Sequence, residues 1–121
     1  MKSRRILVVD DNQAWTRALG DLLRMDGHDV RMAFDGDEAV SAAKGFHPKV
    51  VILDLRMPRM SGHDAARQLR REGGGARPLL IAVSAFDSDE DRQAALRSGF
   101  DHFLVKPIRV EQLNELFARV L

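Results

Sequence analysis

The chain has 121 residues, a formal net charge of +1 and no cysteine. This length is enough for one hydrophobic core and too short for two, so we expect residues 1–121 to form a single domain. The absence of cysteine excludes a disulfide scaffold, a thiolate zinc site and a cysteine nucleophile. Charges of both signs are interleaved, which gives no support for binding to nucleic acid or to a membrane surface. The sequence shows neither a signal peptide nor a membrane span, so a cytoplasmic location is expected.

Four short apolar runs predict strands that are buried on both faces. They cover residues 6–9, 50–53, 79–83 and 103–105. None of them alternates apolar with polar residues, which is typical of a parallel sheet with helices on both faces. A weaker strand is predicted at about residues 29–33.

Amphipathic helices are predicted between and after the strands. The first has apolar residues at helical spacing, namely Trp15, Ala18, Leu19, Leu22 and Leu23. Ser88 is expected to begin a later helix, and Gly27 and Gly99 to follow helix ends. The last helix carries Val110, Leu113, Leu116, Phe117 and Val120 on one face. Five alternating strand–helix units predict a doubly wound α/β sheet.

Each of the four apolar strands is followed by residues suited to handling phosphate. Asp10 and Asp11 follow the first strand, Asp54 the run 50–53, Ser84 the run 79–83, and Lys106 the run 103–105. Ligands of an open α/β sheet bind outside the carboxyl ends of its strands. We therefore expect these side chains to meet in one pocket.

The charges of this pocket indicate a divalent cation and a phosphoryl group. Three ionised carboxylates and one ammonium leave a net negative charge that one Mg²⁺ would cancel. An ionised carboxylate can act as a nucleophile and form an aspartyl phosphate. A metal ion, a lysine and a hydroxyl can together position and neutralise the phosphoryl oxygens.

At these residues the sequence resembles the response-regulator receiver domain of two-component signalling. The resemblance extends over the whole chain and is carried by residues 8–12 (VVDDN), 53–62 (LDLRMPRMSG), 84–85 (SA) and 106–107 (KP). It implies a flavodoxin-like fold, with a five-stranded parallel sheet of order 2-1-3-4-5 and five helices. Residues 27–30 and 95–107 are similar to receivers attached to hybrid histidine kinases, although a free single-domain regulator is equally compatible with the sequence.

The resemblance implies how the acidic residues act. Asp54 would accept a phosphoryl group from a histidine kinase or a histidine phosphotransfer protein in a phosphorelay. Asp10, Asp11 and Asp54 would bind Mg²⁺ together with the backbone carbonyl of Arg56. The domain would be a signalling switch that catalyses its own phosphorylation and dephosphorylation, rather than a metabolic enzyme.

The remaining site residues are also assigned by the resemblance. Lys106 would pair with the phosphoryl group and Ser84 would hydrogen-bond to it. Ser84 and Phe103 would form the switch that changes conformation and controls a partner, or a fused kinase or output domain. No direct contact with nucleic acid or with a membrane is expected.

Three other functions are compatible with parts of the pattern. A small Mg²⁺-dependent phosphatase would also use an aspartyl phosphate, but Arg56 stands where a second acid would be needed. A flavin-binding module would place the flavin phosphate at the first loop, where Asp10 and Asp11 would repel it. A receiver-like interaction domain that is never phosphorylated would not need the complete set of site residues.

Two further expectations concern single side chains. We interpret Trp15 as a core residue, and the basic run Arg67, Arg70, Arg71 and Arg77 as a solvated face rather than a nucleic-acid patch. Arg56 and Phe86 lie two residues past Asp54 and Ser84, respectively. We expect them to shield the acyl phosphate from water.

Overall fold

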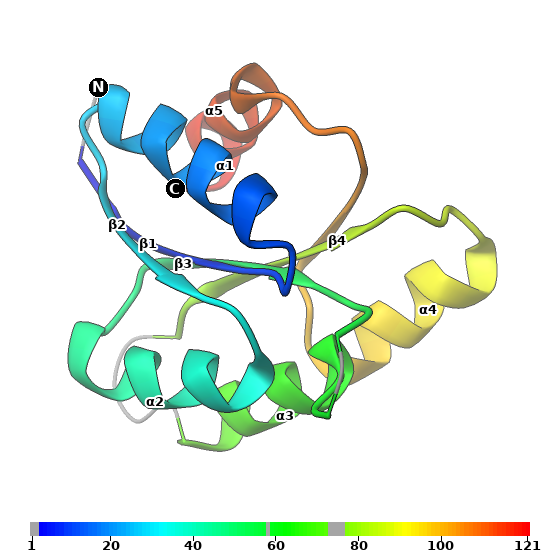
Figure 1. Cartoon of the computed structure of the whole chain (residues 1–121). Helices are drawn as coiled ribbons and strands as arrows, with labels where there is room; N and C mark the ends of the chain where they lie inside the picture. The colour runs from blue at the N-terminus through cyan, green and yellow to red at the C-terminus, as the bar shows by residue number, and fades with distance from the viewer. Residues whose placement is uncertain (1–2, 58, 73–76) are drawn as a thin grey trace.

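The computed structural model describes residues 3–57, 59–72 and 77–121. Within these ranges, strands and helices alternate along the chain as the sequence predicts (Figure 1). The strands are β1 (Arg5–Val9), β2 (Asp29–Ala33), β3 (Val50–Asp54), β4 (Leu79–Ser84) and β5 (His102–Val105). The helices are α1 (Gln13–Met25), α2 (Gly36–Phe46), α3 (Gly62–Glu72), α4 (Asp89–Ser98) and α5 (Val110–Val120). Pro58, which belongs to the receiver-like stretch 53–62, lies outside the described residues.

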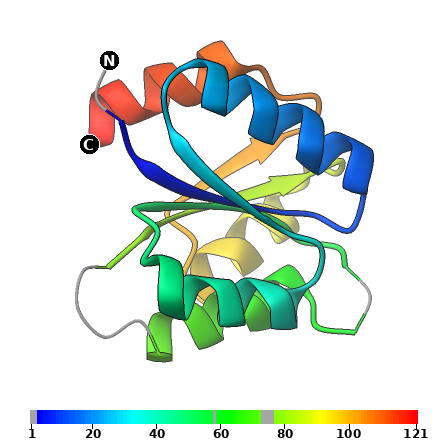
Figure 2. The same ribbon diagram turned by 60° about the vertical axis from the view of Figure 1, so that its left-hand side comes forward.

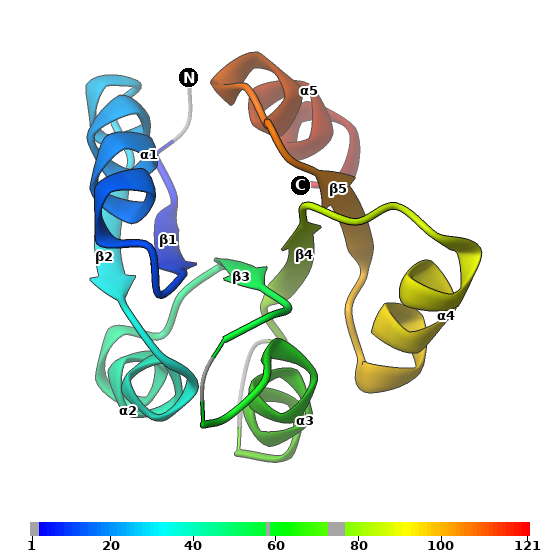
Figure 3. The ribbon, with the colours of Figure 1, turned by 45° about the vertical axis from the view of Figure 1, so that its right-hand side comes forward.

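The strands form one parallel sheet of order β2-β1-β3-β4-β5, which confirms the expected topology. One row of paired residues crosses the whole sheet, from Met32 through Val8, Ile52 and Ile81 to His102. Helices α1 and α5 cover one face, and α2, α3 and α4 lie on the other (Figures 1 and 2). Because every strand runs in the same direction, the carboxyl ends of the strands share one edge (Figure 3).

The central strands contribute side chains to both faces, because successive residues of a strand point to opposite sides. One core lies against α1 and α5 and takes from the strands Ile6, Val8, Val50, Ile52, Ile81 and Val83. The other lies against α2, α3 and α4 and takes Leu7, Val9, Val51, Leu53, Leu80 and Ala82. This double burial explains why the strand sequences are continuously apolar.

The prediction that residues 103–105 are buried on both faces is wrong. Every residue of β5 is only half-buried. β5 lies at one edge of the sheet and has a neighbour, β4, on one side only. Its apolar sequence resembles that of the central strands, and only its place in the sheet exposes it.

The buried face of α1 also differs from the predicted one. Thr16, Leu19, Gly20 and Leu23 are buried, whereas Leu22 is 48% exposed. Thr16 can be buried because its hydroxyl hydrogen-bonds to the backbone carbonyls of Asp10 and Asn12, at 3.0 and 2.8 Å. Trp15 packs against the core on the α1 and α5 side of the sheet, as predicted, but its side chain is only half-buried.

Helix ends follow the predicted capping residues. The Ser88 side chain accepts a hydrogen bond from the Asp91 backbone N–H and begins α4. Gly99 ends the same helix at φ +106°, in the left-handed region that glycine adopts without strain. Gly27, at φ +91°, follows the end of α1 in the same way.

Arg70 is the exception in the basic run that we expected to be solvated. Its side chain is 17% exposed and pairs with Asp101 at 2.7 Å. It also donates to the backbone carbonyls of Gly99 and Pro78, at 2.7 Å each from its two terminal nitrogens. Arg67, Arg71 and Arg77 are exposed, as predicted. Arg70 therefore ties α3 to the segments that lead into β4 and β5.

Gly62, the first residue of α3, packs directly against the backbone at the end of β3. Its N–H donates to the Leu55 carbonyl at 3.0 Å. A Cβ atom at this position would overlap the Asp54 carbonyl oxygen and lie 2.7 Å from the Leu55 Cα. Glycine is thus needed here for a close approach that sets the position of the Asp54 loop.

Substituting Gly62 should therefore destabilise the protein. We expect Gly62→Ala to lower the free energy of unfolding by about 1–3 kcal/mol, because backbone atoms cannot rotate away from the added methyl group. The matched control is Gly45→Ala in α2, where a Cβ meets nothing within 4 Å; it should raise stability by about 0.5–1 kcal/mol. Urea unfolding of the three proteins measures both effects, and equal stability of Gly62→Ala and wild type would contradict this account of the packing.

Candidate active site

The sequence-predicted acidic residues meet at the carboxyl edge of the sheet. Asp10 follows β1, and Asp54 is the last residue of β3, the strand beside it. One carboxylate oxygen each from Asp10, Asp11 and Asp54 lies within 4.8 Å of the others. Asp10 and Asp54 are buried, whereas Asp11 is exposed. The cluster is thus a pair of buried carboxylates with a third at the rim.

Lys106 joins this cluster from the end of β5. Its ammonium Nζ lies 2.7 Å from Asp10 Oδ2 and 3.7 Å from Asp54 Oδ1. The Lys106 side chain is 25% exposed and that of Asp10 only 1%. The other Asp10 oxygen accepts a hydrogen bond from the Asn12 backbone N–H at 3.0 Å. Both oxygens of Asp10 therefore have a partner, as a buried carboxylate requires.

Burial and like charges raise the pKa of two carboxyl groups at the site, those of Asp54 and Asp11. Burial raises the pKa of Asp54 from 3.8 to about 6, and the neighbouring Asp10 charge adds to the effect, while Lys106 opposes it. The pKa of Asp11 is raised as well, by partial desolvation and by Asp10 beside it. Carboxylates held this close resist full ionisation unless a cation compensates them.

The donor set fits a hard divalent cation such as Mg²⁺, which prefers carboxylate oxygens and water as ligands. Asp10, Asp11 and Asp54 are the residues that could hold it. The backbone of Arg56 acts against burial and lowers the pKa of Asp54. Whether the Arg56 carbonyl is a further ligand stays a prediction.

Ser84 is held at the same edge, at the end of β4. It is 1% exposed, and its backbone carbonyl accepts a hydrogen bond from the Lys106 N–H at 2.8 Å. Its hydroxyl oxygen accepts from the Phe86 N–H at 3.1 Å. The hydroxyl hydrogen is therefore the part of Ser84 that can be donated to a bound oxyanion.

Arg56 and Phe86 contact each other beside the site. The Arg56 guanidinium carbon lies 4.2 Å from the centroid of the Phe86 ring, and an Arg56 nitrogen lies 4.0 Å from a carboxylate oxygen of Asp91 in α4. These contacts link the loop after Asp54 to the loop after Ser84. The sequence placed both residues near the site but did not predict that they stack.

Phe103 is half-buried in the edge strand, where an arginine of α4 covers it. The Arg92 guanidinium carbon lies 4.8 Å from the ring centroid, and Arg92 Nε donates to Asp87 Oδ1 at 2.6 Å. The aromatic ring is thus in contact with α4. Arg92 was not singled out in the sequence, where an arginine in a polar helix gives no such signal.

Trp15 is the second neighbour that sequence reasoning missed. Its ring centroid lies 4.5 Å from the Lys106 Nζ. Its position in the first turn of α1, just after Asp10 and Asp11, was the available signal, because that turn starts at the carboxyl edge of the sheet.

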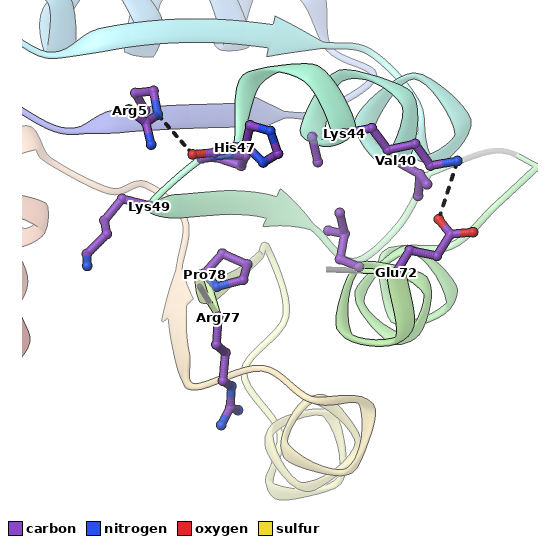
Figure 4. Close-up of a pocket in the computed structure, with 11 residues that line it drawn as sticks. Arg5, Val40, Lys44, His47, Lys49, Glu72, Arg77 and Pro78 are labelled. Carbon is purple, nitrogen blue, oxygen red and sulfur yellow. Dashed lines mark hydrogen bonds and ion pairs between the residues drawn. The ribbon is translucent and has the colours of Figure 1, made fainter. Parts of the chain in front are cut away.

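A cavity of about 200 Å³ lies at the opposite edge of the sheet, near the amino ends of β1, β3 and β4 (Figure 4). Its cationic rim is partly engaged: Arg5 Nε donates to the His47 carbonyl at 2.9 Å, and Lys44 pairs with Glu72 at 3.8 Å. Arg77, also at this cavity, pairs with Asp101 at 3.2 Å. None of the three carboxylates lines this cavity, so it is not part of the candidate site. The candidate site is identified by its charged side chains.

Comparison with known proteins agrees with this geometry. The family model described as the response regulator receiver domain matches residues 6–118. The chain belongs to this receiver family. A curated relative, the response regulator MprA of Mycolicibacterium vanbaalenii, is 41% identical over 109 residues, which are 90% of this chain and 46% of that protein. The probable transcriptional regulator ycf27 of Porphyridium aerugineum is 36% identical over 100% of this chain and 49% of its own length. The receiver thus spans about half the length of these relatives.

Solved receiver structures share the fold. The chemotaxis protein CheY4 of Vibrio cholerae superposes with a TM-score of 0.91 at 28% identity, covering 99% of this chain and 100% of that one. The receiver domain of the sensor histidine kinase PA1611 from Pseudomonas aeruginosa, solved with a magnesium ion in its active site cleft, gives 0.86 at 30% identity, with coverage of 98% and 97%. The Saccharomyces cerevisiae Ssk1 receiver, solved with the histidine phosphotransfer protein Ypd1, gives 0.86 at 30%, with coverage of 94% and 86%. In the described part of this receiver, no helix is long and apolar enough to cross a membrane.

The raised pKa of Asp54 predicts how stability depends on pH. In the folded state the pKa is about 6, against 3.8 for an ordinary aspartate. Between these two pKa values the folded protein keeps a proton on Asp54 that the unfolded chain has lost. The stability that this proton contributes is fully present below pH 4 and is lost as the pH rises through 6. Without divalent cations, Asp54→Asn should exceed the wild type in stability by about 1–2 kcal/mol at pH 7.5, and this excess should disappear near pH 4.

Urea unfolding of both proteins across this pH range tests the prediction. Asp64→Asn, which changes an exposed carboxylate of α3, is the matched control and should show no such excess. Adding Mg²⁺ at pH 7.5 should narrow the gap, because a bound cation stabilises the ionised wild-type cluster. A stability difference that does not vary with pH would contradict the proposed desolvation of Asp54.

Proposed function

We propose that this receiver accepts a phosphoryl group on Asp54 from a phosphohistidine of a histidine kinase or a histidine phosphotransfer protein. The observation that carries the proposal is the position of Asp54, buried beside Asp10 and 3.7 Å from the Lys106 ammonium. A nucleophilic carboxylate next to a fixed cation is suited to phosphoryl transfer, which depends mainly on positioning and charge neutralisation.

The transfer replaces one bond to phosphorus with another. A carboxylate oxygen of Asp54 attacks the phosphorus atom, a P–O bond forms, and the P–N bond to the donor imidazole breaks. The imidazole leaves with the bonding electron pair and takes up a proton. The product is an aspartyl phosphate, whose extra negative charge must be balanced within the site.

Two side chains can balance the charge of the phosphoryl group. The Lys106 ammonium already lies between Asp10 and Asp54, so a short movement would bring it to a phosphoryl oxygen. The Ser84 hydroxyl can donate its hydrogen to another oxygen while it still accepts from the Phe86 N–H. Mg²⁺ bound by Asp10 and Asp11 would neutralise phosphoryl oxygens and so supply the remaining positive charge. The same groups would catalyse loss of the phosphoryl group to water.

The proposed switch runs from Ser84 and Phe103 to α4. If Ser84 turns toward a phosphoryl group, the loop that precedes α4 follows it, because Phe86 is bound to its hydroxyl. Phe103 contacts α4 through Arg92. A change at this face would control a partner or an output domain, which is consistent with relatives about twice as long as this chain. We place the protein in the cytoplasm, where kinases of this signalling type present their phosphohistidine.

A small phosphatase with an aspartyl phosphate intermediate is the main alternative. Such an enzyme would need a second acid near Asp54, and Arg56 occupies the position where it was expected. The Arg56 side chain instead stacks on Phe86 and pairs with Asp91. The signalling function is therefore favoured.

Intact-protein mass after incubation with acetyl phosphate tests the proposed function. We expect the wild type to gain one phosphoryl group only when Mg²⁺ is present, because the carboxylate cluster needs a compensating cation. Asp54→Asn should gain none, whereas Asp64→Asn should behave as the wild type. Hydroxylamine should release the phosphoryl group as inorganic phosphate, because it attacks the acyl carbon of an acyl phosphate and leaves a hydroxamate on the aspartate.

Phosphorylation of Asp54→Asn at the wild-type rate would show that another residue is the acceptor. If the wild type gains no mass from acetyl phosphate, a phosphorylated histidine phosphotransfer protein replaces it as donor. No gain from either donor would overturn the proposal.

The contact between Arg56 and Phe86 predicts a long-lived phosphoryl group. We propose that this pair, stacked at 4.2 Å, limits the approach of water to the acyl phosphate. Arg56→Asn and Phe86→Glu should each accelerate hydrolysis by roughly 2- to 5-fold, the scale expected when an exposed cation–π contact is lost. Arg59→Asn, at an exposed position of the same loop, is the control. Decay of the phosphoprotein mass measures the rates, and unchanged rates in both variants would remove the shielding role.

A further inference from the structure

The indole ring of Trp15 lies against the ammonium group of Lys106. The distance from Nζ to the ring centroid is 4.5 Å, within the range of a cation–π interaction. Trp15 is half-buried and the Lys106 side chain is 25% exposed, so the contact lies at the border between the site and solvent. Trp15 also packs against the core on the α1 and α5 side of the sheet, but that packing alone does not account for an ammonium on the ring.

The backbone of Trp15 is fixed by the same residues that form the acidic cluster. The Asn12 side chain begins α1 by accepting from the Trp15 N–H at 3.1 Å. The Asn12 N–H in turn donates to Asp10 Oδ1 at 3.0 Å, and the other Asp10 oxygen pairs with Lys106 at 2.7 Å. Asp10, Asn12, Trp15 and Lys106 thus form a closed circuit of contacts.

This closed set of contacts can restrict the movement of the Lys106 side chain. A lysine ammonium sits on a flexible four-carbon stem and can leave the site for water. The face of an indole ring attracts a cation without neutralising it, unlike a further carboxylate. A ring at this place can therefore restrict the ammonium and leave its charge available to a phosphoryl group.

We propose that Trp15 is a positioning residue, whose ring holds the Lys106 ammonium between Asp10 and Asp54 and thereby accelerates phosphorylation of Asp54. The inference rests on the proposed function, since it concerns the same site. A ring that only fills space would be replaced equally well by any apolar side chain of similar size. A ring that holds a cation predicts a graded loss, from Trp through Phe to Leu.

The test compares phosphorylation by acetyl phosphate and Mg²⁺ in a double-mutant cycle. Trp15→Leu should react roughly 2- to 5-fold more slowly than the wild type, and Trp15→Phe should lie between them. In a Lys106→Met background, where no ammonium remains, Trp15→Leu should cause no further loss. Phe34→Leu is the matched control. It also removes an aromatic ring that contacts a cation, since the guanidinium carbon of Arg17 in α1 lies 5.4 Å from the Phe34 ring centroid. This variant should keep the wild-type rate of phosphorylation.

A second readout needs no phosphoryl donor. Trp15 is the one tryptophan of the chain, so the indole fluorescence comes from the ring in question. Lys106→Met should change the yield or the wavelength of this emission if the ammonium lies on the ring. Urea unfolding of every variant identifies any protein that has failed to fold. If Trp15→Leu fails to fold, Trp15→Phe, which retains an aromatic ring, is compared with the wild type in its place.

The outcomes separate this inference from the proposed function. A wild type that is phosphorylated at the same rate as Trp15→Leu overturns the positioning role alone. The same holds for a loss that persists undiminished in the Lys106→Met background, or for an emission that Lys106→Met leaves unchanged. A wild type that accepts no phosphoryl group from any donor overturns the proposed function, and the positioning role with it.

Discussion

The crowding of carboxylates at one edge of a parallel sheet is the constraint on which this site depends. Parallel pairing places the ends of β1 and β3 side by side, so Asp10 and Asp54 must lie close together. Burial raises the pKa of Asp54, and Lys106 supplies compensating charge from within the described site. The site is consequently left with a need for further positive charge, which is the electrostatic condition for binding a divalent cation.

The elements around the cluster hold it in place from several directions. Asn12 caps α1 and binds Asp10, so the start of this helix is coupled to the cluster. Gly62 lets α3 approach the backbone of Asp54. Arg56 and Phe86 join the two loops on the other side. Rigid placement of this kind is what phosphoryl transfer requires, since positioning supplies much of its catalysis.

Much of the fold and of the site was predictable from local patterns. Apolar runs without alternation identified the strands, and the polar residues directly after them identified Asp10, Asp54, Ser84 and Lys106 as neighbours. Exposure was less predictable. Residues 103–105 have the same apolar composition as a central strand, yet β5 is half-buried because it has a neighbour on one side only. Leu22 has helical spacing to other apolar residues but falls outside the stripe that faces the sheet.

The sequence by itself determined the alternation of strands and helices and the set of chemically competent residues at the strand ends. Both features can be recognised in short stretches of the chain, because they depend on the local spacing of apolar residues and on the residues that directly follow each parallel strand. Only the tertiary structure decided that Trp15 contacts Lys106, that Arg92 covers Phe103 and that Arg70 is buried against Asp101. Such contacts join different elements of the chain, and they are set by how each helix packs on the sheet, which no local pattern records.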